Sequence, residues 1–166
     1  MARSRPYVAV AGTGDADAAA ARLAEEVGRG LGEAGAVLVC GGLGGVMEAA
    51  CRGARDAGGT TIGLLPGADR AAANAHVEIA VATGLGELRN GLIVRACDAL
   101  IAIGGGWGTL SEIALALKFG RPVVGLDTWE PGHAGATREE IVRAADPAGA
   151  VARALELAAS AKSLRS

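Results

Sequence analysis

The segment ALIAIGGGWGTLSEIALALK, residues 99–118, carries the pattern that decides the fold. Its first five residues form a continuous apolar run, which is typical of a strand that is covered on both faces. Four glycines follow within the next five residues, and the remainder is rich in Ala, Leu and Glu, which favour a helix. A buried strand that leads through a glycine turn into a helix is one half of a β-α-β unit, so this segment predicts an α/β protein.

The same order of apolar run, glycine turn and helical stretch repeats on both sides of this segment. The predicted strands are 7–11, 37–40, 60–64, 77–81, 99–103, 122–126 and 141–144, and the predicted helices are 16–33, 46–57, 85–97, 109–119 and 147–161. Strands that alternate with helices of this length form right-handed crossovers and a parallel sheet. We therefore predict a single doubly wound, Rossmann-like α/β domain with about six to seven strands and helices on both faces. It spans 1–166, with its core at 7–127 and a C-terminal strand and helix at 138–162.

The start of the C-terminal part allows two interpretations. Thr137 and Glu140 could form a capping box at the start of a helix. The preferred interpretation is a short strand near 141–144, followed by a helix in which Asp146 is the N-cap and Pro147 is the first residue.

Composition and charge exclude several classes of protein. Lys and Arg number 16 against 18 Asp and Glu, and only four residues are aromatic, so a nucleic acid is not expected as a partner. No run of 18 apolar residues is present, so no membrane span is expected. The three cysteines form no CxxC pair, and both histidines are far from any two cysteines, so we expect no metal site. The odd, low cysteine count also favours a reducing compartment, and we expect the cytoplasm.

Three glycine loops follow predicted strands, at 12–15, 41–45 and 104–108. In a parallel sheet they all lie at the carboxyl edge, where open α/β sheets bind their ligands. A helix start offers free backbone N–H groups and glycine lets an anion approach them, so we expect a phosphorylated small molecule as the ligand. The candidate ligand-binding residues are Gly12, Thr13, Gly41, Gly42, Gly44, Gly45, Met47, Asn90, Gly104, Gly105, Gly106, Trp107, Gly108 and Thr109.

None of these three loops matches the motif of a common nucleotide-binding class. They lack the dinucleotide fingerprint GxGxxG and the phosphate loop GxxxxGK[ST], and the chain has no GxSxG nucleophile elbow. The pattern therefore disfavours a dehydrogenase, a P-loop enzyme and a serine hydrolase.

Two charged residues stand beside the glycine loops. Thr109 is the predicted N-cap of its helix and Glu112 the third helical residue, so Glu112 either faces the pocket or only closes a capping box. Arg89 either binds a phosphate through two hydrogen bonds or lies on the surface. Met47 and Trp107 could form apolar walls for a flat ring, and ordinary packing explains them equally well.

Three stretches together resemble one known family. They are VLVCGGLGGVMEAACRGARDAGGTTIGLLPG (37–67), GELRN (86–90) and GGGWGTLSEIALAL (104–117), and they resemble the LONELY GUY superfamily of Rossmann-like proteins, once labelled "possible lysine decarboxylases". The resemblance covers about residues 7–127. It implies hydrolysis of the N-glycosidic bond of a nucleoside 5′-monophosphate to a free base and ribose 5-phosphate, with no cofactor required.

The resemblance also assigns roles to individual residues. Arg89 and Glu112 match the catalytic arginine and glutamate of the family's enzymes. The positions that match its phosphate loop are Gly105, Gly106, Gly108 and Thr109. It further implies that the chain forms a homodimer or homotetramer.

Two departures from the family pattern leave a second hypothesis open. Gly104 stands where the family motif has proline, and Asn90 stands where it has lysine. These features resemble a branch that includes the molybdenum cofactor carrier proteins, which bind a pterin phosphate and are not known as hydrolases. The main hypothesis is a phosphoribohydrolase, and the alternative is a non-catalytic carrier of molybdenum cofactor or a similar pterin or nucleotide phosphate. A pyridoxal decarboxylase is excluded because Lys118 lies more than two helical turns from the glycine loop.

Overall fold

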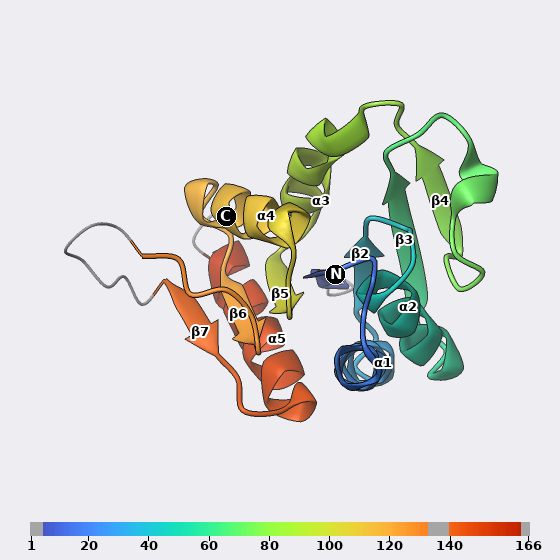
Figure 1. Ribbon diagram of the computed structural model, residues 1–166. Coiled ribbons are helices and arrows are strands. Elements are labelled where there is room, and N and C mark those ends of the chain that lie inside the picture. The colour runs from blue at the N-terminus through green and yellow to red at the C-terminus, as the bar shows by residue number, and fades with distance from the viewer. Residues whose placement is uncertain (1–4, 133–139, 164–166) are drawn as a thin grey trace.

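The computed structural model describes residues 5–132 and 140–163. Within these residues, seven parallel strands form one sheet in the order β4-β3-β2-β1-β5-β6-β7 (Figure 1). The strands are β1 (Tyr7–Gly12), β2 (Val37–Cys40), β3 (Thr60–Leu65), β4 (Ile79–Ala82), β5 (Ala99–Ile103), β6 (Val123–Leu126) and β7 (Ile141–Arg143). The helices are α1 (Ala18–Glu33), α2 (Val46–Asp56), α3 (Asn90–Ala96), α4 (Trp107–Lys118) and α5 (Pro147–Ser163), with 3₁₀ turns η1 (Arg70–Ala72) and η2 (Gly86–Arg89). The predicted Rossmann-like fold class is confirmed.

The sheet is covered on both faces. Helices α1, α2 and α5 lie on one face, and α3 and α4 lie on the other (Figure 1). The chain winds in one direction from β1 to β4, then returns to the middle of the sheet and winds in the other direction from β5 to β7. The order therefore reverses between β1 and β5, and the carboxyl ends of these two strands border the crevice where such folds bind ligands.

Helices α1 and α2 are in backbone contact because glycines lie where they meet. A Cβ atom at Gly28 would lie 1.9 Å from the carbonyl oxygen of Ala50, and one at Gly53 would lie 2.0 Å from the carbonyl oxygen of Glu25. Such distances are impossible for a real side chain, so only glycine permits this approach. The close packing holds the first turn of α2 against the carboxyl end of β1.

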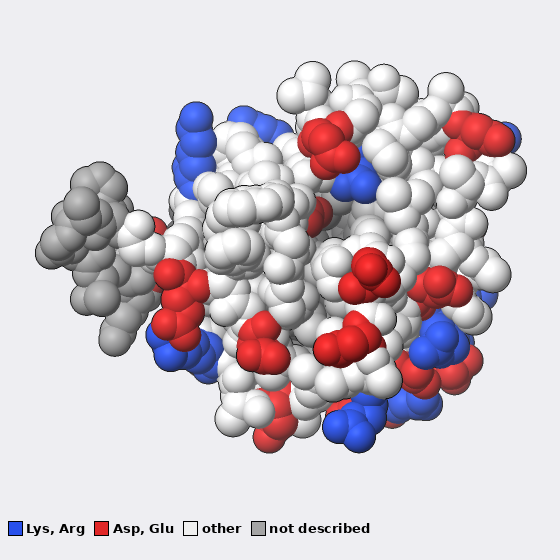
Figure 2. Space-filling view, in the orientation of Figure 1, with Lys and Arg blue, Asp and Glu red and all other residues white. Residues whose placement is uncertain are grey.

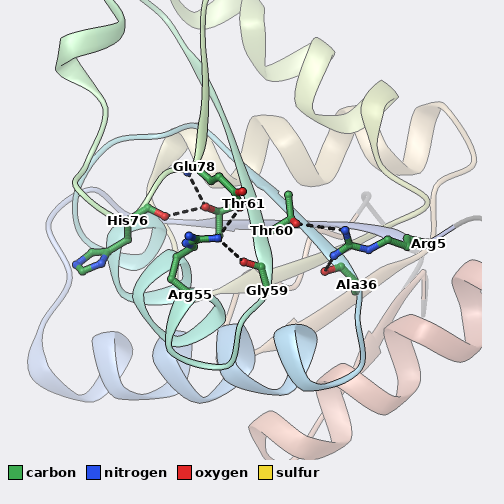
Figure 3. A network of polar contacts seen from close by, with 8 residues as sticks. All are labelled: Arg5, Ala36, Arg55, Gly59, Thr60, Thr61, His76 and Glu78. Carbon is green, nitrogen blue, oxygen red and sulfur yellow. Dashed lines mark hydrogen bonds and ion pairs between the residues drawn. The ribbon is translucent and has the colours of Figure 1, made fainter.

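Polar contacts attach the edge strand β4 and the loop before it to the rest of the sheet (Figure 3). The buried hydroxyl of Thr61 donates to the carbonyl oxygen of His76 at 2.7 Å and accepts from the Glu78 amide at 2.9 Å. Arg55 of α2 forms an ion pair with Glu78 at 2.5 Å and donates to the Gly59 carbonyl oxygen at 2.9 Å. The contacts of Thr61 satisfy a buried hydroxyl, and the partly exposed Arg55–Glu78 pair lies beside them at the amino edge of the sheet, opposite the glycine loops.

The helix predicted at 85–97 is wrong in its first half. A 3₁₀ turn spans Gly86–Arg89, and the α-helix begins only at Asn90. Gly86 adopts a left-handed φ angle of 57°, which a continuous helix cannot contain. Within the predicted segment, Ile93 of α3 is buried, whereas Leu88 of the 3₁₀ turn is 81% exposed.

The C-terminal part follows the preferred interpretation. Asp146 caps α5, since its Oδ1 accepts a hydrogen bond from the Gly149 amide at 2.7 Å, and Pro147 is the first helical residue. Thr137 and His133 lie outside the described residues. Every helix in the described ranges is too short or too polar to span a membrane.

Candidate functional site

The three predicted glycine loops meet at the carboxyl edge of the sheet. They follow β1, β2 and β5, which are neighbours in the strand order. Figure 2 shows that this face is hollowed between α4 on one side and β2 and β3 on the other, below α3, with side chains of both charges at the edge of the hollow. The topological switch point and a surface hollow therefore coincide.

The loops after β1 and β2 pack tightly against each other. A Cβ atom at Gly12 would lie 2.4 Å from Cγ1 of Val46, and one at Gly45 would lie 2.3 Å from the carbonyl oxygen of Thr13. The Val46 amide donates to that same oxygen at 3.0 Å. Gly45 also has a φ of 66°, which disfavours any other residue. Packing between protein segments thus accounts for Gly12 and Gly45.

The loop after β5 is open instead. Gly104 and Gly105 have positive φ angles of 57° and 152°, and a Cβ atom at Gly106 or Gly108 would meet nothing within 4 Å. Helix α4 begins directly after Gly106, which has no side chain to cap it. The first N–H groups of α4 have no acceptor within the helix, so this loop presents backbone donors beside free space.

The predicted capping role of Thr109 is wrong. The N-cap is Gly106, in an extended conformation with φ −102° and ψ −170°, and the first helical hydrogen bond runs from Leu110 to Gly106 at 3.1 Å. Thr109 is therefore the third helical residue and Glu112 the sixth, so they form no capping box. The Thr109 side chain instead turns inward: it is 2% exposed, and its hydroxyl is buried without a hydrogen-bond partner.

Arg89 is buried at the end of η2, so its interpretation as a surface residue is wrong. One terminal nitrogen of its guanidinium donates to Asn90 Oδ1, and the other lies 3.5 Å from the carbonyl oxygen of Gly41. Its Nε has no partner. A Cβ atom at Gly41 would lie 2.7 Å from Arg89 Nη2 and 2.9 Å from Met47 Sδ, so glycine at position 41 makes room for the guanidinium.

Asn90 connects Arg89 to helix α4. Its Nδ2 donates to Ser111 Oγ at 2.9 Å, and that hydroxyl donates to the carbonyl oxygen of Gly108 at 2.7 Å. The side chain of Asn90 is itself buried. This hydrogen-bonded chain fixes the guanidinium relative to the start of α4. The sequence analysis did not identify Ser111, although it lies between Thr109 and Glu112.

Glu112 lies on α4, and its side chain is buried close to that of Arg89. Burial raises the pKa of its carboxyl group to about 8, against the opposing effect of the Arg89 charge and with a small further contribution from Glu87. Among the described residues, no hydrogen bond or ion pair within 4 Å joins Glu112 to Arg89. At pH 7 the carboxyl group is therefore mostly protonated and can donate a hydrogen bond.

An aromatic pair that the sequence analysis missed lies at the open loop. Trp107, the first residue of α4, stacks on Trp129 with ring centroids 5.4 Å apart. Trp129 Nε1 donates to the carbonyl oxygen of Gly106 at 3.2 Å, and the Thr128 hydroxyl donates to that of Gly104. The available signal was the position of Trp129 just after β6, the strand next to β5 in the sheet.

The described residues contain no cluster of three or more His, Cys, Asp or Glu side chains that could hold a metal ion. Cys40, Cys51 and Cys97 are buried free thiols. Cys40 and Cys51 lie with their sulfur atoms 3.5 Å apart beneath the loop after β2. The groups that meet at the carboxyl edge are backbone amides, the guanidinium of Arg89, the carboxyl group of Glu112, the polar side chains of Asn90, Thr109 and Ser111, and two indoles.

A family comparison agrees with this geometry. The model of the SLOG cluster4 family matches residues 5–155. The chain belongs to this family. The predicted relationship to the LONELY GUY-like proteins, on the branch that includes molybdenum cofactor carriers, is thereby confirmed.

Individual relatives extend the family assignment. An uncharacterized protein from Archaeoglobus fulgidus is 46% identical over 119 residues, which are 72% of this chain and 78% of that protein. The solved structure of the molybdenum cofactor binding protein from Rippkaea orientalis has a TM-score of 0.84 and 35% identity, covering 95% of this chain and 99% of that one. The Moco carrier protein from Chlamydomonas reinhardtii has a TM-score of 0.83 and 39% identity, covering 94% and 99%.

Proposed function

We propose that this chain binds a phosphorylated heterocyclic molecule of the molybdenum-cofactor type and carries it without converting it. The observation that carries this proposal is a pair of buried side-chain donors without partners, Arg89 Nε and Thr109 Oγ1, beside the uncapped start of α4. Leaving a polar group buried and unsatisfied costs about 1–3 kcal/mol. Ligand oxygens that accept from these donors would remove that cost.

Three kinds of group at the site would contribute to phosphate binding. The open loop at 104–108 supplies backbone amides at the positive end of the α4 dipole. Arg89, held by Asn90, supplies a charged donor. Glu112, mostly neutral at pH 7, donates a hydrogen bond instead of repelling a dianion. The functions of two similar solved proteins, a molybdenum cofactor binding protein and a Moco carrier protein, support a binding function.

Asn90 favours a carrier over a hydrolase. It replaces a lysine of the resembling enzymes with a neutral side chain that accepts a hydrogen bond from Arg89 and donates one to Ser111. The site therefore has one positive side chain where the enzymes have two.

One observation favours the phosphoribohydrolase as a second candidate function. Arg89 and Glu112, the pair that matches the catalytic residues of the family's enzymes, are brought together in the same buried place. With a pKa of about 8, Glu112 suits protonation of a departing base better than deprotonation of water. In such a reaction water would add to C1′ of the ribose while the base leaves with a proton.

One set of samples separates the two functions. Purified protein is incubated with AMP, N6-substituted AMP, GMP and a pterin monophosphate, and binding is measured by calorimetry while released base and ribose 5-phosphate are measured by chromatography. We expect saturable binding and no product. Base release by the wild type that is lost in Glu112→Gln would establish the hydrolase instead. Absence of binding to every phosphorylated compound would contradict both functions.

We also propose that the chain self-associates, as a dimer or tetramer. Exposed apolar side chains occur on β4, at and just before η2, and on α3, namely Ile79, Val81, Leu85, Leu88 and Leu92. Exposed apolar side chains that gather into one patch are typical of an interface. Sedimentation equilibrium of the wild type and of Leu88→Ser checks this proposal, and we expect the variant to shift toward the monomer.

A further inference from the structure

The two tryptophans of the chain meet at the ligand loop. Only four residues are aromatic, and two of these, Trp107 and Trp129, form one pair with an interplanar angle of 33°. Although they are 22 positions apart, Trp107 directly follows the glycines after β5 and Trp129 lies against them. The side chain of Trp107 is 79% exposed, which is unusual for a large aromatic residue in a protein that has only four aromatic residues.

Trp129 is held rigidly in place. Its Nε1 donates to the carbonyl oxygen of Gly106, and a Cβ atom at Gly105 would lie 2.6 Å from Nε1, so the indole rests on the bare glycine backbone. Asp127 adopts a left-handed φ of 51°, which turns the chain sharply after β6. The hydrogen bond from Thr128 to Gly104 then ties this turn to the loop. Packing therefore explains Trp129, which in turn supports one side of Trp107.

Packing does not explain the exposed part of Trp107. As the first residue of α4, Trp107 joins the backbone donors of the helix start to an aromatic surface that faces solvent. The buried, unpartnered hydroxyl of Thr109 lies two residues further along the same helix, about 200° around its axis from Trp107. A molecule whose phosphate accepts from the backbone donors of the helix start therefore has an indole within reach of its remaining part.

We propose that the Trp107–Trp129 pair is the stacking surface for the planar ring of the bound molecule, so that the start of α4 recognises both the phosphate and the ring. This inference rests on the proposed function and narrows its ligand to a phosphorylated planar heterocycle, such as a pterin or a purine. Every such ring has a π-face, so stacking gives affinity without strict selection among bases. Choice between a pterin and a purine then depends on other groups of the site.

The experiment compares a ligand that has a ring with one that lacks it. GMP serves as the first probe, because guanine shares its 2-amino-4-oxopyrimidine part with pterin, and ribose 5-phosphate serves as the second. Calorimetry measures both affinities in the wild type, Trp107→Ala, Trp107→Phe and Tyr7→Ala. Tyr7 is an exposed aromatic residue at the opposite edge of the sheet and is the matched control.

We expect Trp107→Ala to lower the affinity for GMP about tenfold and to leave the affinity for ribose 5-phosphate unchanged, because loss of one base–aromatic stack has an effect of this size. Trp107→Phe should recover most of the affinity, and Tyr7→Ala should bind both ligands as the wild type does. GMP should also quench tryptophan fluorescence, which reports only on this pair because the chain has no other tryptophan.

The possible failures are distinguishable. If the wild type binds neither probe nor a pterin monophosphate, that result contradicts both the proposed function and this inference. If ribose 5-phosphate binds and Trp107→Ala leaves GMP unaffected, or weakens both probes equally, only the stacking role is overturned. A tryptophan emission that shifts with protein concentration and not with GMP would assign Trp107 to a contact between copies of the chain and would also overturn it.

Discussion

The glycine loops after β1 and β2 and the glycine loop after β5 look alike in sequence but differ in what surrounds them. In the first two, Gly12 and Gly45 leave no room for a methyl group, because backbone and side chains of the other loop occupy that space. In the third, Gly106 and Gly108 face open space. The first pair of loops is thus a packed support, and the third is the open surface at which a ligand can approach the backbone.

The largest expected effect tests the packed side of this comparison. Gly45→Ala should lower the free energy of unfolding by about 3 kcal/mol or more, because the methyl group would overlap the Thr13 carbonyl and the left-handed φ disfavours alanine. Urea denaturation followed by circular dichroism measures the change. If this variant unfolded at the same urea concentration as the wild type, the two loops would not be packed as described.

The next effect concerns the charged donor beside the open loop. Arg89→Gln should lower the affinity for ribose 5-phosphate about 100-fold, since loss of a buried charged donor costs about 2–5 kcal/mol of binding free energy. Arg89→Lys should also bind poorly, because an ammonium group lacks the planar fork that Asn90 holds. Calorimetry measures both variants, and retention of wild-type affinity by Arg89→Gln would remove Arg89 from the site.

The third effect is a pH dependence. Glu112 has a pKa raised to about 8, so it loses its proton between pH 7 and pH 9 and then repels a bound phosphate. The affinity for ribose 5-phosphate should fall about tenfold over this interval in the wild type and stay nearly flat in Glu112→Gln. Calorimetry at both pH values measures the difference. Parallel pH profiles of the two proteins would contradict the assignment.

The same residue affects stability with a defined sign. A folded-state pKa above the ordinary value of 4.5 means that the fold favours the protonated carboxyl. This contribution is complete below pH 4.5 and is lost as the pH rises through about 8. Glu112→Gln should therefore gain stability relative to the wild type as the pH rises from 5 to 9, which denaturation at each pH would show.

The smallest effect tests the open side of the comparison. Gly106→Ala should change the free energy of unfolding by less than about 1 kcal/mol, because the backbone is extended and nothing lies within 4 Å of the new methyl group. It should lower the affinity for ribose 5-phosphate severalfold, because the methyl group would occupy space beside the backbone N–H groups at the start of α4. Gly45→Ala and Gly106→Ala thus form a matched pair, and equal destabilisation by both would end the distinction between the loops.

Features that depend on residues close together in the chain, such as strands and helix caps, were mostly predicted correctly. Strands β1, β2, β3, β5 and β6 and the capping of α5 by Asp146 follow from local signals, namely apolar runs, glycine turns and a cap followed by proline. The N-cap of α4 was predicted three residues too late, because Thr109 is a good N-cap by residue type. In the structure Gly106 takes that place, while Trp107 packs on Trp129 and the hydroxyl of Thr109 turns inward.

By itself, the sequence determined the α/β class, the parallel sheet and the placement of three glycine loops at one edge, because these depend on short-range periodicity and on the handedness of β-α-β crossovers. Tertiary structure alone decided which loop is packed and which is open, that Arg89 is buried, that the pKa of Glu112 is raised and that Trp129 meets Trp107. Burial and contact depend on segments that are distant in the chain, and no local pattern encodes the space that those segments leave.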